Sequence, residues 1–385
     1  MLRYLTAGES HGPALTAIVE GFPSGVALDT DFIDRELRRR QGGYGRGKRQ
    51  ALETDRIIVD SGTYHGVTTG GPITLRLVNN DAKLERLKEP AAPRGGHIDL
   101  AGAINYQTGI RQVLERASAR ETALRVAVGA LARLLLKEVG IGVIGYVREI
   151  GGIAATPTTT DLAVRDASPV YTLNPGADPA IVAAIDAAKG AGDTLGGVVE
   201  VVVTRCPIGL GSHAQWDRKL DARLAAAVMS VQAIKAVEIG LGVEAARRPG
   251  SKVMDPIEYT ADDPDDRRFG FRRPTNNAGG IEGGTSNGED IVVRASKKPI
   301  STLAARGPSV HMATKEPHPA SYERSDVCAV PAASVIVENV VAFEIAAAVV
   351  EKYVGTSLEA IKTAMAAMHE LSKRHLDEWR MGEGD

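Results

Sequence analysis

The chain has 385 residues, of which 43% are hydrophobic and 24% charged, and its formal net charge is −2. These proportions are typical of an ordinary globular protein and exclude a disordered chain. The nearly balanced charge excludes a general attraction to nucleic acid or to anionic membranes, so any site for anions has to be local.

Neither export nor membrane insertion is indicated by the sequence. The apolar run at the N-terminus is interrupted by the polar segment 8–12 and is therefore too short for the hydrophobic core of an export signal. A long apolar stretch, residues 335–350, contains two glutamates, which argues against a membrane span. Cys206 and Cys328 lie far apart and no Cys/His cluster accompanies them, so neither a disulfide framework nor a metal site is indicated. We therefore expect a cytoplasmic protein.

The first candidate motif, residues 8–12, follows a short predicted strand and places Ser10 and His11 between glycines. A histidine in such a loop can present its ring to a cleft and act as a general acid near neutral pH. The alternative is a histidine that is hydrogen-bonded within a turn. The motif alone leaves both interpretations open.

An arginine-rich segment, residues 38–49, begins in a predicted helix over 30–40 and continues beyond the helix stop at Gly42. Arginines in the last turn of a helix complement the helix dipole, and this role accounts for Arg38 and Arg39. Arg46 and Arg49 lie past the helix, where guanidinium groups on glycine-rich backbone favour recognition of phosphate or carboxylate. An RNA-binding loop is the other interpretation, disfavoured by the 4% content of aromatic residues and by the balanced charge.

Short β-rich runs alternate with longer helical patterns along the chain, and no low-complexity segment marks a linker. The clearest strands are predicted at 56–59, 73–78, 198–204 and 291–294. This alternation predicts an α/β or α+β fold. The segment 161–189, with an alanine-rich helix after Asp178, is predicted to be peripheral, and we assign it no chemistry.

Two further segments combine arginine with glycine or with a helix start. Residues 94–99 contain an arginine, two glycines and a histidine. Ser118 and Glu121 form a predicted capping box for a helix to about Glu138, and arginines flank its N-terminus, where free amides already favour an anion. This arrangement predicts a phosphate site. Surface pairing of Arg120 with a neighbouring glutamate is the alternative.

Three more long helices are predicted, over 219–239, over 331–354 and from a second capping box at 356–359. The endings of two predicted helices are similar, because residues 137–143 and 237–243 share the order of their glycines and apolar residues. This similarity is a weak sign of an internal repeat.

The segment 276–289 is rich in glycine and carries almost nothing to bury, so a ligand could contact its backbone. A linker or a chain of tight turns is the alternative. Residues 298–302 then offer a cation and two hydroxyls, and residues 324–331 place an arginine and Asp326 before a helix that begins with proline. Neither a Walker phosphate loop nor a Rossmann fingerprint is present.

Six segments resemble, in order and spacing, the motifs of chorismate synthases: 8–12, 38–49, 95–99, 115–122, 276–289 and 324–333. The resemblance spans nearly the whole chain. It implies a carbon–oxygen lyase that converts 5-enolpyruvylshikimate 3-phosphate to chorismate by 1,4-anti elimination of phosphate, the last step of the shikimate pathway. It also implies reduced FMN as a cofactor that is not consumed overall.

The resemblance implies three catalytic residues and a set of binding residues. His11 would protonate the leaving phosphate, His97 would protonate the reduced flavin near N1, and Asp326 would assist removal of the proton at N5. The implied flavin contacts are Arg116, Ala117, Ser118, Gln232, Ala233, Gly283, Lys298, Pro299, Ile300, Ser301, Thr302 and Arg324. The implied contacts to substrate or NADP are Ser10, Arg40, Arg46, Arg49 and Arg94. Ala117 stands where many chorismate synthases have serine, so a hydroxyl contact is missing there.

The implied fold is a single domain over residues 1–385, an α+β sandwich of antiparallel sheets around central helices, usually assembled as a homotetramer. NADPH or an external reductant would reduce the flavin, and the sequence leaves that choice open. From the residues alone, two other functions stay open: a flavin-free phosphate lyase or transferase, and a module that binds nucleic acid.

Overall fold

Two antiparallel sheets form the outer layers of the structure, a computed structural model that describes residues 1–47, 55–261, 266–323 and 325–382. The first sheet has the strand order β1 (Arg3–Ala7), β2 (Ala14–Glu20), β6 (Ile73–Val78), β3 (Ile58–Ser61). The second has the order β10 (Ile234–Ile239), β15 (Ile291–Lys297), β9 (Gly197–Thr204), β7 (Gly142–Ile150), β8 (Ile153–Ala154). Short hairpins pair β4 (Thr63–Tyr64) with β5 (Val67–Thr68), β11 (Glu258–Tyr259) with β12 (Phe271–Arg272), β13 (Ile281–Glu282) with β14 (Thr285–Ser286), and β16 (Pro308–Val310) with β17 (Pro317–Pro319).

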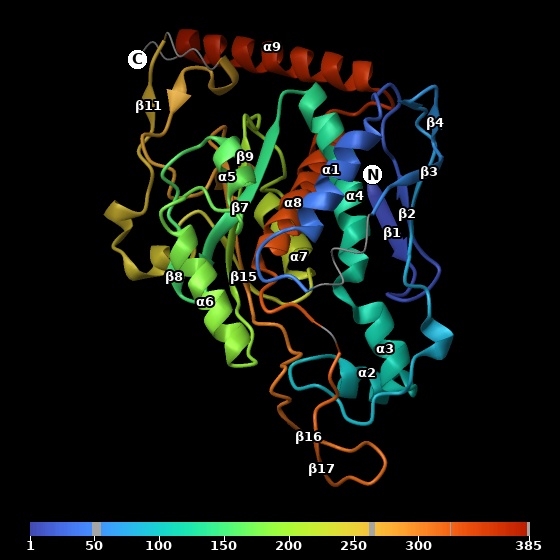
Figure 1. Cartoon of the computed structure of the whole chain (residues 1–385). Helices are drawn as coiled ribbons and strands as arrows, with labels where there is room; N and C mark the ends of the chain where they lie inside the picture. Colours follow the sequence, from blue (N-terminus) through green and yellow to red (C-terminus); the bar gives the residue numbers. More distant parts are fainter. Residues whose placement is uncertain (48–54, 262–265, 324, 383–385) are drawn as a thin grey trace.

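Three helices lie between the two sheets: α1 (Thr30–Gln41), α4 (Thr122–Glu138) and α8 (Val330–Lys352) (Figure 1). The other helices are α2 (Asp99–Tyr106), α3 (Ile110–Ala117), α5 (Leu162–Ala167), α6 (Asp178–Gly190), α7 (Leu220–Met229) and α9 (Leu358–Gly382). Among the described residues α8 is the one helix long and apolar enough to cross a membrane, and 89% of its most apolar window is buried inside the protein. It is apolar on all sides because it packs against α4 on one side and β7 and β9 on the other.

Two glycines allow α8 to approach its neighbours closely. A Cβ atom at Gly129 of α4 would lie 2.1 Å from the carbonyl oxygen of Asn339, and one at Gly145 of β7 would lie 2.7 Å from that of Ser334. Any side chain at these positions would therefore push α8 away from its neighbours. The spacing of the central layer depends on both glycines.

A buried cluster of charges connects the central helices. The carboxylate of Glu338, on α8, is fully buried and lies 3.1 Å from Arg39 and 3.2 Å from Arg133. Arg165 approaches the same carboxylate at 3.7 Å. Glu36 lies 2.7 Å from both Arg39 and Arg133. Burial opposes ionisation of Glu36, but the two arginines outweigh it and hold the pKa of this carboxyl below its usual range.

The structure confirms the α+β class and several predicted elements. The predicted helices over 30–40 and 331–354 are α1 and α8, and the alanine-rich helix after Asp178 is α6. The strands predicted at 73–78, 198–204 and 291–294 are β6, β9 and β15, while the one predicted at 56–59 begins later, at Ile58. Both cysteines are buried and free.

The predicted helix over 219–239 is wrong in its second half. Helix α7 ends at Met229, the chain turns at Ala233 with a φ of +70°, and β10 then pairs with β15. The two similar endings noted in the sequence therefore differ in structure. Residues 137–143 join α4 to β7, whereas residues 237–243 join β10 to a 3₁₀ turn, so these two segments are not a structural repeat.

Both predicted capping boxes are wrong in detail. Ser118 accepts from the amide of Arg120 and begins a 3₁₀ turn, and α4 follows that turn. The side chain of Glu121 does not reach back to the cap, because it accepts hydrogen bonds from neighbouring elements. At the start of α9 the capping hydroxyl belongs to Ser357, which accepts from the amide of Ala360.

Candidate functional site

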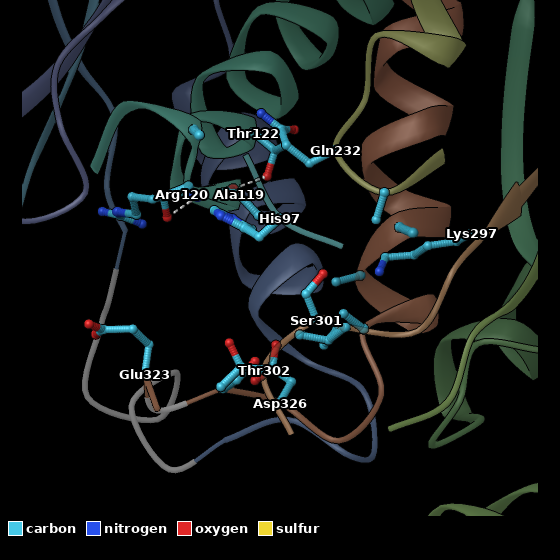
Figure 2. A pocket seen from close by; sticks show the side chains of 18 of the residues that line it. His97, Ala119, Arg120, Thr122, Gln232, Lys297, Ser301, Thr302, Glu323 and Asp326 are labelled. Carbon is cyan, nitrogen blue, oxygen red and sulfur yellow. Dashed lines mark hydrogen bonds between the residues drawn. The ribbon is translucent and has the colours of Figure 1, made fainter. Parts of the chain in front are cut away.

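A cavity of about 590 Å³ lies where several loops meet the N-terminal part of α8, and Figure 2 shows side chains from separate parts of the chain around it. This volume is typical of a site for a small molecule. The lining includes most of the predicted site residues: Ser10, His11, Arg40, Arg46, Arg94, His97, Ala117, Ser118, Gln232, Ala233, Lys298, Pro299, Ile300, Ser301, Thr302 and Asp326. Two others, Arg49 and Arg324, lie outside the described residues.

His11 is held in place by a buried carboxylate. Its Nδ1 lies 3.0 Å from both carboxylate oxygens of Glu115, and its backbone amide donates to the same carboxylate at 2.9 Å. Burial alone would raise the pKa of Glu115, but hydrogen bonds and charge from His11 hold it below the usual range. Because an ionised carboxylate can only accept, Nδ1 is the donor, and the proton that the ring exchanges toward the cavity is the one at Nε2.

His97 has the same type of support from Asp99. Nδ1 of His97 lies 2.5 Å from the carboxylate of Asp99. The same carboxylate accepts two hydrogen bonds from Arg94, one from Nε at 2.8 Å and one from Nη2 at 2.9 Å. Burial would raise the pKa of Asp99, yet the hydrogen bonds from His97 and Arg94 hold it well below its usual range. The cavity thus contains two histidines, each oriented by a buried carboxylate.

The depressed pKa of Asp99 predicts a pH dependence of stability. A carboxyl with a lowered folded-state pKa stabilises the fold above its unfolded value of about 3.9, and this contribution is lost as the pH falls. We expect Asp99→Asn to lower the free energy of unfolding by about 2 kcal/mol at pH 7. Urea denaturation between pH 7 and pH 3 measures the free energy of unfolding of the variant and of the wild type, and the difference between the two should become smaller below about pH 4. A difference that stays the same at all pH values would contradict the lowered pKa of Asp99.

Asp326 lies on the opposite side of the cavity and is fixed by two contacts. One oxygen lies 2.5 Å from the guanidinium of Arg46, and the other accepts from the backbone amide of Gly47 at 2.7 Å. The loop after α1 therefore provides both a counter-charge and a backbone donor for this carboxylate. The side chain of Asp326 also lines the cavity, where its oxygens can accept hydrogen bonds from a ligand.

Two arginines connect the cavity to the start of α4. Arg40 is buried and donates to Thr122 Oγ1 at 3.0 Å and to the Ala119 carbonyl at 2.9 Å. Arg120 is also buried and forms a two-point ion pair with Asp55, at 2.6 and 2.7 Å. The interpretation of Arg120 as a surface residue paired with a neighbouring glutamate is therefore wrong, because its partner comes from a distant part of the sequence.

Gln232 offers an unsatisfied acceptor to the cavity. Its Nε2 donates to Glu121 at 3.3 Å, whereas its Oε1 is buried without a partner among the described residues. The adjacent Ala233 adopts a positive φ of +70°, an unusual conformation for a residue with a side chain. Across the cavity Ser118 donates to Ser10 Oγ at 3.2 Å. A ligand with an N–H or O–H group would satisfy Gln232.

Two predicted flavin contacts lie outside the lining that the described residues form. Arg116 donates instead to the carbonyl oxygens of Thr6 and Gly8. Gly283 sits with a φ of +59° in the hairpin of β13 and β14, where a Cβ atom would meet only His213 at 3.9 Å. In this structure the segment 276–289 forms tight turns, and contacts of Arg116 and Gly283 with a flavin stay predictions.

Several lining residues were not predicted from the sequence. Lys297 lies next to a predicted contact and points into the cavity from the end of β15 (Figure 2). Helix α8 contributes small and apolar side chains to the lining. Because α8 is apolar along its whole length, the sequence does not distinguish these residues from those of the core. The lining residues that were not predicted include Thr122, Val231, Lys297, Glu323, Ala329, Ala332, Ala333 and Ile336.

Comparisons with known proteins agree on one family. The sequence model described as chorismate synthase matches residues 2–350. A chorismate synthase of Geobacter metallireducens is 54% identical over 94% of this chain and 97% of its own length. One from Shouchella clausii is 51% identical over 97% of this chain and 100% of its own length. A crystal structure of chorismate synthase covers 97% of this chain and 98% of its own, with 39% identity and a TM-score of 0.79.

Proposed function

The chain belongs to the chorismate synthase family, and we propose that its cavity binds reduced FMN and 5-enolpyruvylshikimate 3-phosphate together. The enzyme is a carbon–oxygen lyase that eliminates phosphate from this substrate and forms chorismate, the last step of the shikimate pathway. The observation that supports FMN in the cavity is the buried, unpartnered Oε1 of Gln232, which suits an N–H or O–H donor of a flavin. When bound, reduced FMN supplies electron density as the phosphate leaves.

Charge in the cavity suits these ligands. Substrate and cofactor together carry two carboxylates and two phosphates. The lining contains six basic side chains, Arg40, Arg46, Arg94, Arg120, Lys297 and Lys298, and two acidic ones, Glu323 and Asp326. Fixed cations hold anions in place and stabilise charge that develops on a leaving phosphate. We propose that Arg40, Arg46 and Arg94 contact the substrate.

We propose proton-handling roles for three side chains. His11, oriented by Glu115, would donate from Nε2 to the leaving phosphate. His97, oriented by Asp99, would be the proton donor near N1 of a bound flavin, and Asp326, held by Arg46 and Gly47, would be the acceptor near N5. These proposed roles are supported by the contacts that orient the two rings and the carboxylate at the cavity.

The remaining expectations stay proposals. We propose that the chain forms one cytoplasmic domain, that the two sheets with their central helices are the sandwich that the family resemblance implies, and that four copies assemble. Ser10, Ala117, Ser118, Ala233 and residues 298–302 are proposed as further ligand contacts, since they line the cavity. NADPH or a separate reductant would keep the flavin reduced.

An anaerobic assay tests the proposed cofactor. We expect the purified protein to release phosphate from 5-enolpyruvylshikimate 3-phosphate only when reduced FMN is present. Oxidised FMN under the same conditions is the matched control and should give no release. Equal phosphate release without flavin would support a flavin-free lyase instead. A second assay adds NADPH and oxidised FMN without another reductant. Phosphate release in this assay would show that NADPH supplies the electrons, and its absence would show that a separate reductant is needed.

A further inference from the structure

Lys297 is a lysine in the cavity without a counter-ion. Its side chain extends from the end of β15 toward the cavity (Figure 2), and among the described residues it forms no ion pair. Its hydrogen bond is a long one, 3.5 Å from Nζ to the carbonyl of Lys298. Lys298 differs, because its ammonium donates to the carbonyl of Gly96 and to Ser301 Oγ.

The charges around Lys297 do not neutralise it. Burial lowers the pKa of Lys297 to about 8, Cys328 and Asp326 favour the charged form, and Arg46 and Lys298 oppose it. The Asp326 carboxylate is already paired with Arg46, and burial raises the pKa of the Cys328 thiol, so that thiol is neutral at pH 7. At pH 7 the protein therefore holds a partly buried ammonium without an anion of its own, an unfavourable arrangement unless a ligand supplies one.

We propose that Lys297 binds an anionic group, a phosphate or a carboxylate, of a ligand held in this cavity. This inference rests on the function proposed above, which brings a phosphorylated cofactor and a phosphorylated substrate to the same place. An ammonium on a flexible chain is a compact point charge, well suited to an oxyanion that approaches from one side. The pairing would supply the missing counter-ion and would leave the pair of Asp326 and Arg46 intact.

Ligand binding and protonation of Lys297 are then linked. A bound anion raises the pKa of the ammonium, so the ligand binds more tightly to the protonated protein. Because the pKa without ligand is about 8, the ammonium is mostly protonated at pH 7 and mostly neutral at pH 9, so the affinity falls above pH 8. The dissociation constant should increase about tenfold between pH 7 and pH 9, and binding at pH 9 should take up a proton.

The experiment compares Lys297→Met, Lys297→Arg and wild type by calorimetric titration at pH 7 and pH 9. Oxidised FMN and 5-enolpyruvylshikimate 3-phosphate are titrated separately, in buffers of different ionisation enthalpy, which reports proton uptake. We expect Lys297→Met to bind one of them about tenfold more weakly at pH 7, without proton uptake at pH 9. Lys297→Arg keeps the charge but does not titrate, so its affinity should stay nearly constant between the two pH values.

The control is Lys137→Met, which removes an exposed lysine on α4 and should change neither affinity nor proton uptake. An effect in the FMN titration assigns the anion to the cofactor, and an effect in the substrate titration assigns it to the substrate. If Lys297→Met binds both ligands like the wild type at both pH values, the proposal is overturned. Failure of the wild type to bind FMN would count against the proposed cofactor, and the substrate titration would still decide the role of Lys297.

Discussion

His11→Ala is expected to lower kcat by about 10²- to 10⁴-fold, the usual contribution of a positioned general acid. Elimination creates charge on the departing phosphate, and the proton source that we propose is Nε2 of His11, whose ring is oriented by Glu115. The affinity for FMN should change little, because the variant removes a proton donor and no flavin contact. Anaerobic steady-state kinetics with reduced FMN measure kcat, and a flavin titration measures the affinity.

Two comparisons separate this role from simple damage to the fold. Glu115→Gln keeps a hydrogen-bond partner for Nδ1 but removes the charge, so kcat should fall, but by less than in His11→Ala. His65→Ala removes an exposed histidine that lies outside the cavity lining and should leave kcat unchanged. Wild-type turnover in His11→Ala would contradict the assignment of the general acid.

Elements with strong local signals could be predicted from the sequence. Helix α8 has a proline in its first turn and a continuous apolar pattern, and α1 ends at Gly42, as the sequence indicated. The second half of the helix predicted over 219–239 failed because tertiary pairing overrides local preference. Residues 234–239 bond to β15, which lies far away in the sequence.

The candidate site was predicted through motifs, and the structure adds the contacts between them. No local pattern shows that Arg120 pairs with Asp55, because that contact joins distant segments. The supporting roles of Glu115 and Asp99 are likewise visible only when the rings and carboxylates are placed in space. In the sequence Lys297 resembles any other lysine at the end of a strand. The partial burial of its side chain and its lack of a counter-ion among the described residues are visible only in the structure.

Glu338→Gln is expected to lower the free energy of unfolding by about 3–5 kcal/mol, the usual effect of removing one partner from a buried ion pair. The variant keeps the shape of the side chain but removes a negative charge that three arginines approach, Arg39, Arg133 and Arg165. Glu36 then remains as the buried counter-ion of Arg39 and Arg133. Urea denaturation at pH 7 measures the loss.

The matched control for this prediction is Asp60→Asn, which breaks an exposed pair with Arg76 and should change stability little. A second variant tests the electrostatic cause. Replacing Arg165 by glutamine in the Glu338→Gln background removes one of the three positive charges that approach residue 338 and should recover part of the lost stability. If Glu338→Gln were as stable as Asp60→Asn, the buried cluster could not be what holds α1, α4 and α8 together. Recovery in the double variant would instead show that the loss comes from unpaired positive charge and not from altered packing.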